Sequence, residues 1–410
     1  MALNYIWFGF FVIAFIVALI KLIFLNDTAV FPALLNSTFE SARSGFEVSI
    51  YLTGAMALWL GLMRIGEKGG MVNILAKLVG PFFTRLFPEI PKNHPAIGSL
   101  IMNFSANMLG LDNAATPLGL KAMKEMQEVN KQKDTASNAQ IMFLVLNSSG
   151  LSIIPLAILI DRSVKGAVNP TDVFIPILIA TSLSTLVGLI VVSLYQRINL
   201  FDKVIMLYVG SFAAFLAGIV WYFTSLDQQA LQTQSQLYSS IIILSLIISF
   251  LVLGWQRKVP LFETFIEGAK EGFEIAVKII PYLVGFLVAI GLFRVSGSLT
   301  YITEGIAWVI AGLGFDTKFV EALPVAMMKP LSGGSARGMM LDTIDTFGVD
   351  SFVGRTASIF RGATETTFYI IAVYFGSVSI RKTRYAVTAG LLADLAGIIA
   401  GIFVAYMFFG

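Results

Sequence analysis

Residues 329–342, KPLSGGSARGMMLD, place two cations, Lys329 and Arg337, in a strongly apolar chain. A second stretch, RGATETT, adds Arg361 and Glu365. An ionisable side chain at membrane depth costs at least about 2.5–3.5 kcal/mol, so such residues usually bind a substrate or pair with one another. The charges therefore predict a binding site for a polar or anionic ligand, an internal ion network, or both.

The two alternatives assign different partners to the same side chains. In the ion network, Glu365 pairs with one of the three cations near it, and Asp342 pairs at the rim. In the ligand site, the charges act together with Asn103, Asn107 and the exposed backbone amides at the tips of broken helices. A site that is internally paired without ligand can satisfy both alternatives.

Polar breaks also occur in the first half of the chain. NFSANMLGLDN begins at Asn103, and NSSGLSIIP contains Gly150 and Pro155, which should open a helix. Irregular backbone at membrane depth is tolerated only where protein or a water-filled cavity covers it. In the second half, Gly333 and Gly334 allow either close approach of a ligand or tight helix packing. The candidate substrate-binding residues are Asn103, Ser105, Asn107, Asn147, Ser148, Ser149, Lys329, Ser332, Gly333, Gly334, Ser335, Arg337, Arg361, Thr364, Glu365 and Thr366.

The sequence offers few residues for disulfide formation, metal binding or catalysis. The chain has no cysteine and a single histidine, His94, which excludes disulfides, thiolate zinc and thiol catalysis. No nucleotide-binding loop and no pair of nucleophile and base is evident. The net charge of +3 is spread over many loops and indicates no nucleic-acid surface. We therefore expect no enzyme activity, no metal centre and no cofactor.

The composition predicts that these residues lie within a membrane protein. With 57% apolar and 13% charged residues, the 410-residue chain is predicted to be an all-α integral membrane protein. The candidate full spans are residues 4–25, 46–65, 137–160, 171–196, 203–223, 237–255, 276–294, 353–377 and 384–409. Two interrupted apolar stretches, 95–112 and 320–340, are predicted to be re-entrant hairpins. Three amphipathic or charged segments, 67–92, 114–134 and 256–274, are predicted to lie at the surface.

The basic residues predict an orientation. Five loops are expected to be cytoplasmic: 66–92, 119–135, 197–203, 255–275 and 378–384. They hold sixteen Lys and Arg, whereas the loops expected outside, 26–45, 161–170, 224–236, 295–320 and 341–350, hold four. Since cytoplasmic loops collect Lys and Arg, the N-terminus should lie inside and the C-terminus outside.

The sequence also contains a weak internal repeat. GFE, YLTG and GLMR in the first half recur in the same order as GFE, YLVG and GLFR in the second. We therefore predict a first repeat at 1–199, a linking helix and outside loop at 200–236, and a second repeat at 237–410. The single extra span in the linker inverts the second repeat, so both hairpin tips should meet near the membrane midplane.

Long motifs in the same order resemble a known family. FPEIPKNHPAIG and NFSANMLGLDNAATPLGLKAM resemble spore maturation protein A. IPYLVGFLVAIGLFRVSGSL, MKPLSGGSARGM, DSFVGRTASIFRGATETTFYIIAVYFG and GLLADLAG resemble spore maturation protein B. The resemblance covers nearly the whole chain, as in a fusion, and implies the nucleoside-recognition or Gate group. It implies a bacterial cytoplasmic membrane protein that moves a solute, with a role in spore core dehydration in spore formers.

The leading functional hypothesis is a transporter or facilitator of a small polar solute, with anionic and nucleoside-like solutes among the alternatives. Its site would lie between the two hairpins at the membrane midplane. The alternative is a non-transporting scaffold or regulatory protein whose polar core is only structural. A coupling ion stays open: Glu365 could carry H+, and carbonyl groups at 147–150 could bind Na+. The expected partners are the lipid bilayer and the solute, and a homodimer would be compatible with the sequence.

Overall fold

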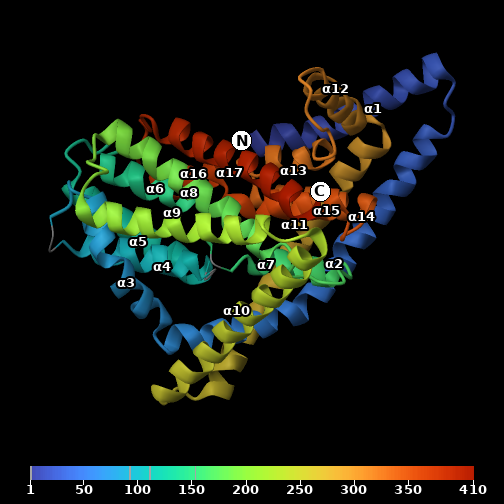
Figure 1. Ribbon diagram of the computed structural model, residues 1–410. Helices are drawn as coiled ribbons and strands as arrows, with labels where there is room; N and C mark the ends of the chain where they lie inside the picture. The colour runs from blue at the N-terminus through green and yellow to red at the C-terminus, as the bar shows by residue number, and fades with distance from the viewer. Residues whose placement is uncertain (1, 92–93, 110–111, 153) are drawn as a thin grey trace.

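A computed structural model describes residues 2–91, 94–109, 112–152 and 154–410, and Figure 1 shows the arrangement of their helices. Within this part of the chain the secondary structure is helical, apart from an isolated β-bridge between Thr135 and Lys382. The helices are α1 Ala2–Leu25, α2 Val30–Lys68, α3 Met71–Leu86, α4 Pro95–Met108, α5 Asp112–Val129, α6 Asn138–Ser149, α7 Leu156–Val164, α8 Phe174–Gln196, α9 Lys203–Thr224, α10 Gln228–Gln256, α11 Leu261–Val295, α12 Ser298–Gly312, a short 3-10 turn Val320–Ala322, α13 Leu323–Met328, α14 Gly333–Phe347, α15 Phe352–Ala363, α16 Thr367–Ser377 and α17 Ala386–Phe409.

The all-α, multi-pass character predicted from the sequence is confirmed. Among the described residues, six helices are long and apolar enough to cross a bilayer: α1, α2, α8, α9, α10 and α17. A seventh crossing is possible if α11 and α12, which meet at a bend of 67°, form one span. The two other predicted spans, 137–160 and 353–377, are each divided into two short helices, α6 with α7 and α15 with α16.

Two boundaries predicted from hydropathy are wrong. Residues 26–45 were expected to be a loop, but from Val30 onward they belong to α2, which is 39 residues long. Residues 256–274 were expected to be a separate surface segment, but from Leu261 onward they begin the 35-residue α11. Hydropathy finds only the apolar part of a helix, whereas the polar parts of α2 and α11 are stabilised by packing against each other.

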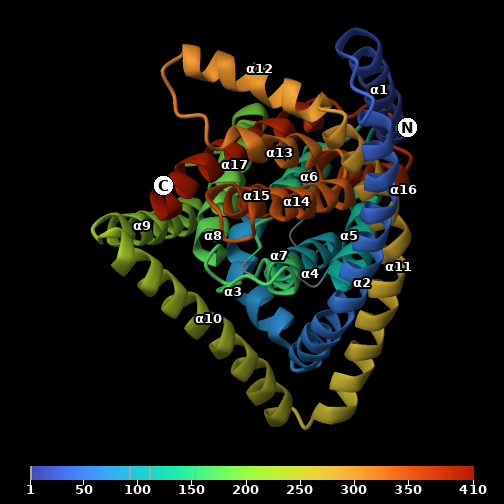
Figure 2. The same ribbon diagram turned by 90° about the vertical axis from the view of Figure 1, so that its right-hand side faces the viewer.

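α2 and α11 lie side by side and run antiparallel, as Figure 2 shows along one edge of the molecule. A Cβ placed on Gly45 would lie 3.0 Å from the Val284 backbone, and one on Gly272 would lie 2.7 Å from the Met56 carbonyl. Glycine therefore lets the two backbones approach closely near both ends of the contact. Arg64 closes the polar end by donating to the Glu267 carboxylate over 2.8 Å.

The order of elements repeats along the chain. In each half a long helix, α2 or α11, is followed by a shorter one, α3 or α12, and the residue before the shorter helix is a glycine with positive φ. These glycines are Gly70, with φ 78°, and Gly297, with φ 88°. A helical hairpin, a broken helix and a final helix complete each half. α9 is an additional helix between the two halves. The domain boundaries after residues 199 and 236 stay predictions.

The final helices of the two halves also pack on each other in antiparallel fashion. The Ser184 hydroxyl of α8 donates to the Ala393 carbonyl of α17 over 2.8 Å. At the other end of the contact, the rings of Tyr195 and Tyr385 stack with centroids 4.4 Å apart. α6 and α15, the first parts of the two broken helices, each pack against both α8 and α17, so this helix pair supports both breaks.

A pair of packed helices lies at each position where a hairpin was predicted, while their re-entrant topology stays a prediction. The first is larger than expected, because α4 returns through all of α5 rather than turning back within 95–112. Residues 110–111, which follow α4 in the chain, lie outside the described residues. The second consists of α13 and α14, with its turn at 329–332, directly before the glycine pair.

We predict that Gly272→Ala destabilises the protein by about 1–3 kcal/mol, because the new methyl group meets backbone atoms of α2 that cannot move aside. Gly285→Ala on the same helix is the matched control, since a Cβ there meets nothing within 4 Å. Thermal unfolding in detergent measures both variants. Equal melting temperatures would contradict close packing of α2 on α11.

Candidate functional site

Three asparagines of the first half form one cluster. Asn107 on α4 donates to the Asn147 side chain on α6 over 2.7 Å and more weakly to Asn103 over 3.4 Å. Asn103, fully buried, donates to the Ala115 carbonyl over 2.8 Å and lies 3.5 Å from the Tyr374 hydroxyl of α16. The cluster therefore joins the first hairpin to the first broken helix through neutral amide groups.

The two broken helices meet at their breaks. The backbone N–H of Glu365 donates to the Ser148 carbonyl over 2.8 Å. Gly150 ends α6 with φ 61°, and a Cβ there would lie 2.7 Å from the Glu365 side chain. Thr181 on α8 donates its hydroxyl to the Gly150 carbonyl over 2.7 Å. Backbone groups released by one break are thus satisfied by the other break and by a neighbouring helix.

The turn of the second hairpin lies against the second break. The Phe368 N–H donates to the Pro330 carbonyl over 3.0 Å, and a Cβ on Gly333 would lie 2.9 Å from the Thr366 hydroxyl. Ser332 caps α14 by accepting from the Ser335 N–H over 3.2 Å. The hairpin turn is therefore held by backbone contacts as well as by its cap.

Lys329, at the hairpin turn, is the buried cation of this region. Its side chain is 1% exposed, and its ammonium lies 3.5 Å from Glu365, whose side chain is 50% exposed. Arg361 lies close enough to interact electrostatically with Lys329, and its Nε is buried without a hydrogen-bond partner among the described residues. The pairing of Glu365 with Lys329 agrees with one form of the predicted ion network.

Arg337 does not belong to this group, and its assignment to the site is corrected. It forms a buried pair with Asp161 on α7, with Nε 2.9 Å from Oδ2 and Nη2 2.5 Å from Oδ1. Arg337 lies one turn into α14 and points away from the hairpin turn toward α7. Only carboxylates close to Arg337 in sequence were expected to pair with it, whereas Asp161 lies in the other half of the chain.

The Arg337 pair is next to a larger ion network that the sequence analysis missed. Arg162, which is fully buried, donates to Asp172 over 2.9 Å and to Asp350 over 3.1 Å. Arg355 reaches the other oxygen of Asp172 over 2.7 Å. These side chains tie the loop between α7 and α8 to the turn between α14 and α15. We refer to Asp161, Arg162, Asp172, Arg337, Asp350 and Arg355 as the six-residue ion network.

Two further carboxylates have definite surroundings. Asp342, predicted to pair at the rim, does so, but with Arg294 of α11 rather than with a cation of the site. Asp394 on α17 was not among the candidates. It is 2% exposed and accepts from the Thr367 hydroxyl over 2.7 Å. It also interacts electrostatically with Lys329 and Glu365, which places it at the second break.

The candidate residues fall into three groups. Those with contacts between elements around the breaks are Asn103, Asn107, Asn147, Ser148, Ser149, Lys329, Gly333, Glu365 and Thr366. Arg361 and Thr364 lie at the same break, Ser332 and Ser335 cap α14, and Gly334 faces open space. Ser105 is buried in α4 without a hydrogen-bond partner for its hydroxyl among the described residues, and Arg337 lies in the six-residue ion network.

The residues that sequence reasoning missed carried a readable signal. Asp161 and Arg162 are adjacent and directly follow an apolar run, and Asp394 interrupts the apolar stretch of α17. Charged residues within a membrane span are usually functional, and this rule would have added all three to the candidate site residues. The predicted span ends at residue 160, just before Asp161 and Arg162. Asp394 lies in GLLADLAG, which was assigned only to the family resemblance.

The comparisons with known proteins match the same elements in both halves. The profile described as "Gate: Nucleoside recognition" matches residues 49–160 and 276–381. The chain belongs to the nucleoside-recognition (Gate) family. Each matched region of this Gate protein extends from the long helix through the hairpin to the broken helix, so the family profile coincides with the elements that form the candidate site.

Two relatives of this Gate protein each match about two fifths of its length. Over 165 residues it is 47% identical to "Spore maturation protein B" of Bacillus subtilis (strain 168), covering 40% of this chain and 91% of that protein. Over 159 residues it is 38% identical to "Spore maturation protein A" of the same organism, covering 39% and 81%. The resemblance predicted from the motifs is thereby confirmed, and the chain is consistent with a fusion of the two.

We predict that Arg337→Ala destabilises the protein by about 3–5 kcal/mol, because it leaves the Asp161 carboxylate buried without its partner. Arg43→Ala is the control, since the Arg43 pair with Glu47 is exposed and should contribute little to stability. Thermal unfolding provides the measurement. Replacing both partners, Arg337→Met with Asp161→Leu, should recover most of the loss, and an unaffected single variant would contradict a structural role.

Proposed function

We propose that the protein is a membrane transporter or facilitator of a small polar solute of the anionic or nucleoside-like class. One observation supports this proposal most strongly. The breaks of two membrane-depth helices meet each other and the turn of a hairpin, and a buried Lys329 faces a half-exposed Glu365 at that meeting point. Transporters built from inverted repeats hold their substrates at such discontinuous helices.

The charges of this region suggest how a solute is bound. Lys329 and Arg361 offer two cationic groups, and in the described part of the chain Glu365 is the one carboxylate within ion-pair distance of Lys329. Since Glu365 is half exposed, it can turn toward solvent when an anionic group of the solute takes its place beside Lys329. Glycine at 334 leaves open space next to the hairpin turn. The asparagine cluster can bind uncharged donor and acceptor groups of a nucleoside-like solute.

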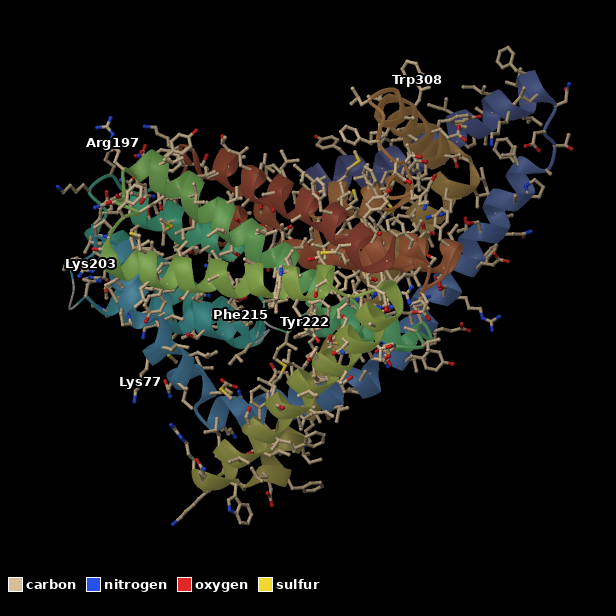
Figure 3. The ribbon with its side chains drawn as sticks, in the orientation of Figure 1. Lys77, Arg197, Lys203, Phe215, Tyr222 and Trp308 are labelled. Carbon is tan, nitrogen blue, oxygen red and sulfur yellow. The ribbon has the colours of Figure 1, made fainter. Side chains whose placement is uncertain are left out.

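We also propose the membrane topology: nine crossings, two re-entrant hairpins, and two halves of inverted orientation in a bacterial cytoplasmic membrane. The antiparallel packing of α2 on α11 and of α8 on α17 supports inversion, because equivalent helices then cross in opposite directions. The excess of Lys and Arg on one side supports a cytoplasmic N-terminus and an external C-terminus. In Figure 3, Lys77, Arg197 and Lys203 lie at the same end of the molecule, as cytoplasmic residues should.

A second candidate function is a membrane scaffold or regulator with a purely structural polar core. The observation that favours it is the six-residue ion network, in which three cations and three carboxylates pair with one another. Such a network stabilises an arrangement of helices without requiring a ligand. It lies apart from the meeting point of the breaks, so the two candidates can be separated by variants in one region or the other.

We predict that Lys329→Met weakens solute binding at least about tenfold, because a charge-assisted hydrogen bond contributes about 1.5–3 kcal/mol. Glu365→Gln should not weaken the binding of an anionic solute, because it removes the carboxylate that competes for Lys329. Purified protein is screened by thermal shift against nucleosides, nucleotides, dicarboxylates and amino acids, and each solute that stabilises it saturably is taken into liposome uptake. Lys382→Met is the matched control, since Lys382 is exposed and pairs with Asp134 in a loop.

Two results would count against the proposal in different ways. Equal binding by wild type and Lys329→Met would move the site away from the hairpin turn. If no solute of any class stabilises the protein, although wild type and variants are folded, the scaffold function is favoured.

The topology predicts opposite accessibility for two introduced cysteines in a chain that has none of its own. Lys131→Cys, between α5 and α6, should react with an impermeant maleimide only after the cells are permeabilised, because it is expected on the cytoplasmic side. Val168→Cys, between α7 and α8 and 93% exposed, should react in intact cells. Labelling of both from the same side would contradict a crossing by α6 and α7.

A further inference from the structure

A cavity of about 360 Å³ lies between α10 and the first break, and no candidate residue of the solute site lines it. Its inner wall contains Ile154, which lies between α6 and α7, and Phe174, the first residue of α8. Its outer wall is formed by residues of α10 from Ile241 to Ser249. Figure 2 shows α10 along the outer side of the molecule, so the cavity lies between a peripheral helix and the core. Its volume is within the range of about 300–1,000 Å³ that is typical of ligand pockets.

The lining of the cavity is apolar. Six of the eight described residues that line it are Ile, Leu or Phe, and the other two are Ser245 and Ser249. The Ser249 hydroxyl donates to the Leu246 carbonyl of its own helix over 2.7 Å, so its proton is not available to a ligand. None of the eight residues is charged. A polar solute would lose its hydration here without replacement hydrogen bonds, whereas an apolar ligand would gain contacts.

The cavity lies near the middle of a helix that is long and apolar enough to cross a bilayer. The apolar part of α10 runs from Thr233 to Gln256, and residues 241–249 occupy its middle. The hydrocarbon core of a bilayer is about 30 Å thick, so the middle of a spanning helix lies about 15 Å from either surface. At that depth the surrounding medium consists of acyl chains. An occupant that comes from the membrane is therefore an acyl chain rather than a head group.

The cavity reaches from the surface of α10 into the core. On α10, Ile241 is 50% exposed and Ile242 is 42% exposed. On the inner wall, Phe174 is fully buried and Ile154 is 5% exposed. An acyl chain beside α10 can therefore enter past the two exposed isoleucines and contact residues that are otherwise shielded from lipid. Side chains around an unfilled apolar space lose dispersion contacts, which favours entry of the acyl chain.

We propose that this cavity binds the end of one acyl chain of a membrane phospholipid, while the head group stays at the bilayer surface. Because Ile154 belongs to the segment between α6 and α7, the bound acyl chain packs against the first break. The same break is held by the hydrogen bond from the Glu365 N–H to the Ser148 carbonyl. The first break is thus supported by the other half of the protein and by lipid, and this lipid site is independent of any transported solute.

The test is photo-crosslinking of the purified full chain in bilayers of phosphatidylethanolamine and phosphatidylglycerol that include a phospholipid with a diazirine at the end of one acyl chain. After irradiation, mass spectrometry locates the labelled residues. We expect labelling of Ile154 and Phe174, which lipid at the outer surface cannot reach. Ser249→Phe places a ring in the cavity and should abolish the labelling of this inner wall. Leu244→Phe is the matched control and should preserve it, because Leu244 lies on the same helix, is 60% exposed and does not line the cavity.

A competition experiment on the wild-type protein covers the case in which Ser249→Phe does not fold. Unlabelled long-chain phospholipid should reduce the labelling of Ile154 and Phe174. A phospholipid with the same head group and short acyl chains should not, because its chains end before the middle of the span. Labelling confined to exposed residues of α10, or inner-wall labelling that neither Ser249→Phe nor long-chain lipid reduces, would overturn the site. Loss of inner-wall labelling in a dimeric fraction would also overturn it, because a second copy of the chain would then cover the cavity.

Discussion

The hydrogen bond from the Glu365 N–H to the Ser148 carbonyl is the contact on which the centre of the molecule depends. A helix that stops at membrane depth releases backbone donors and acceptors that lipid cannot satisfy. Here the N–H of Glu365, just after α15, satisfies a carbonyl at the end of α6, so the two halves of the chain depend on each other at this point. The long α2–α11 contact and the α8–α17 contact bring the halves to the required distance.

The two halves share an order of elements but differ in charge. The first break is lined by uncharged groups such as Asn147 and Ser148, whereas the second carries Arg361 and Glu365. A site with the same charges from both halves would bring like charges together where the two breaks meet, which is unfavourable in low dielectric surroundings. Placing the charges in one half and the amide groups in the other avoids that repulsion, which gives a physical reason for two different repeats in one chain.

Much of the fold was accessible from the sequence because it rests on local signals. Apolar length predicted α1, α8, α9, α10 and α17, and Gly150 with its polar neighbours predicted the first break. The polar ends of α2 and α11 were missed because each is helical only by packing against the other. For the site, pairing of Lys329 with Glu365 was foreseen, since the two lie in neighbouring motifs. The partner of Arg337 was not foreseen, because Asp161 lies 176 residues away and no spacing rule connects them.

The buried charges divide by how completely they are paired. Arg337 and Asp161 exhaust each other in a short, multiply bonded contact, and a ligand that displaced either would leave a buried charge alone. Among the described residues, Lys329 has one ion-pair partner, Glu365, which lies 3.5 Å away and whose side chain is 50% exposed. Incomplete pairing is a lasting cost to the folded state, which binding of the proposed solute would offset. The residues that hold the helices together and those available to ligands can therefore be told apart by pairing, although both sets are charged and buried in the same apolar chain.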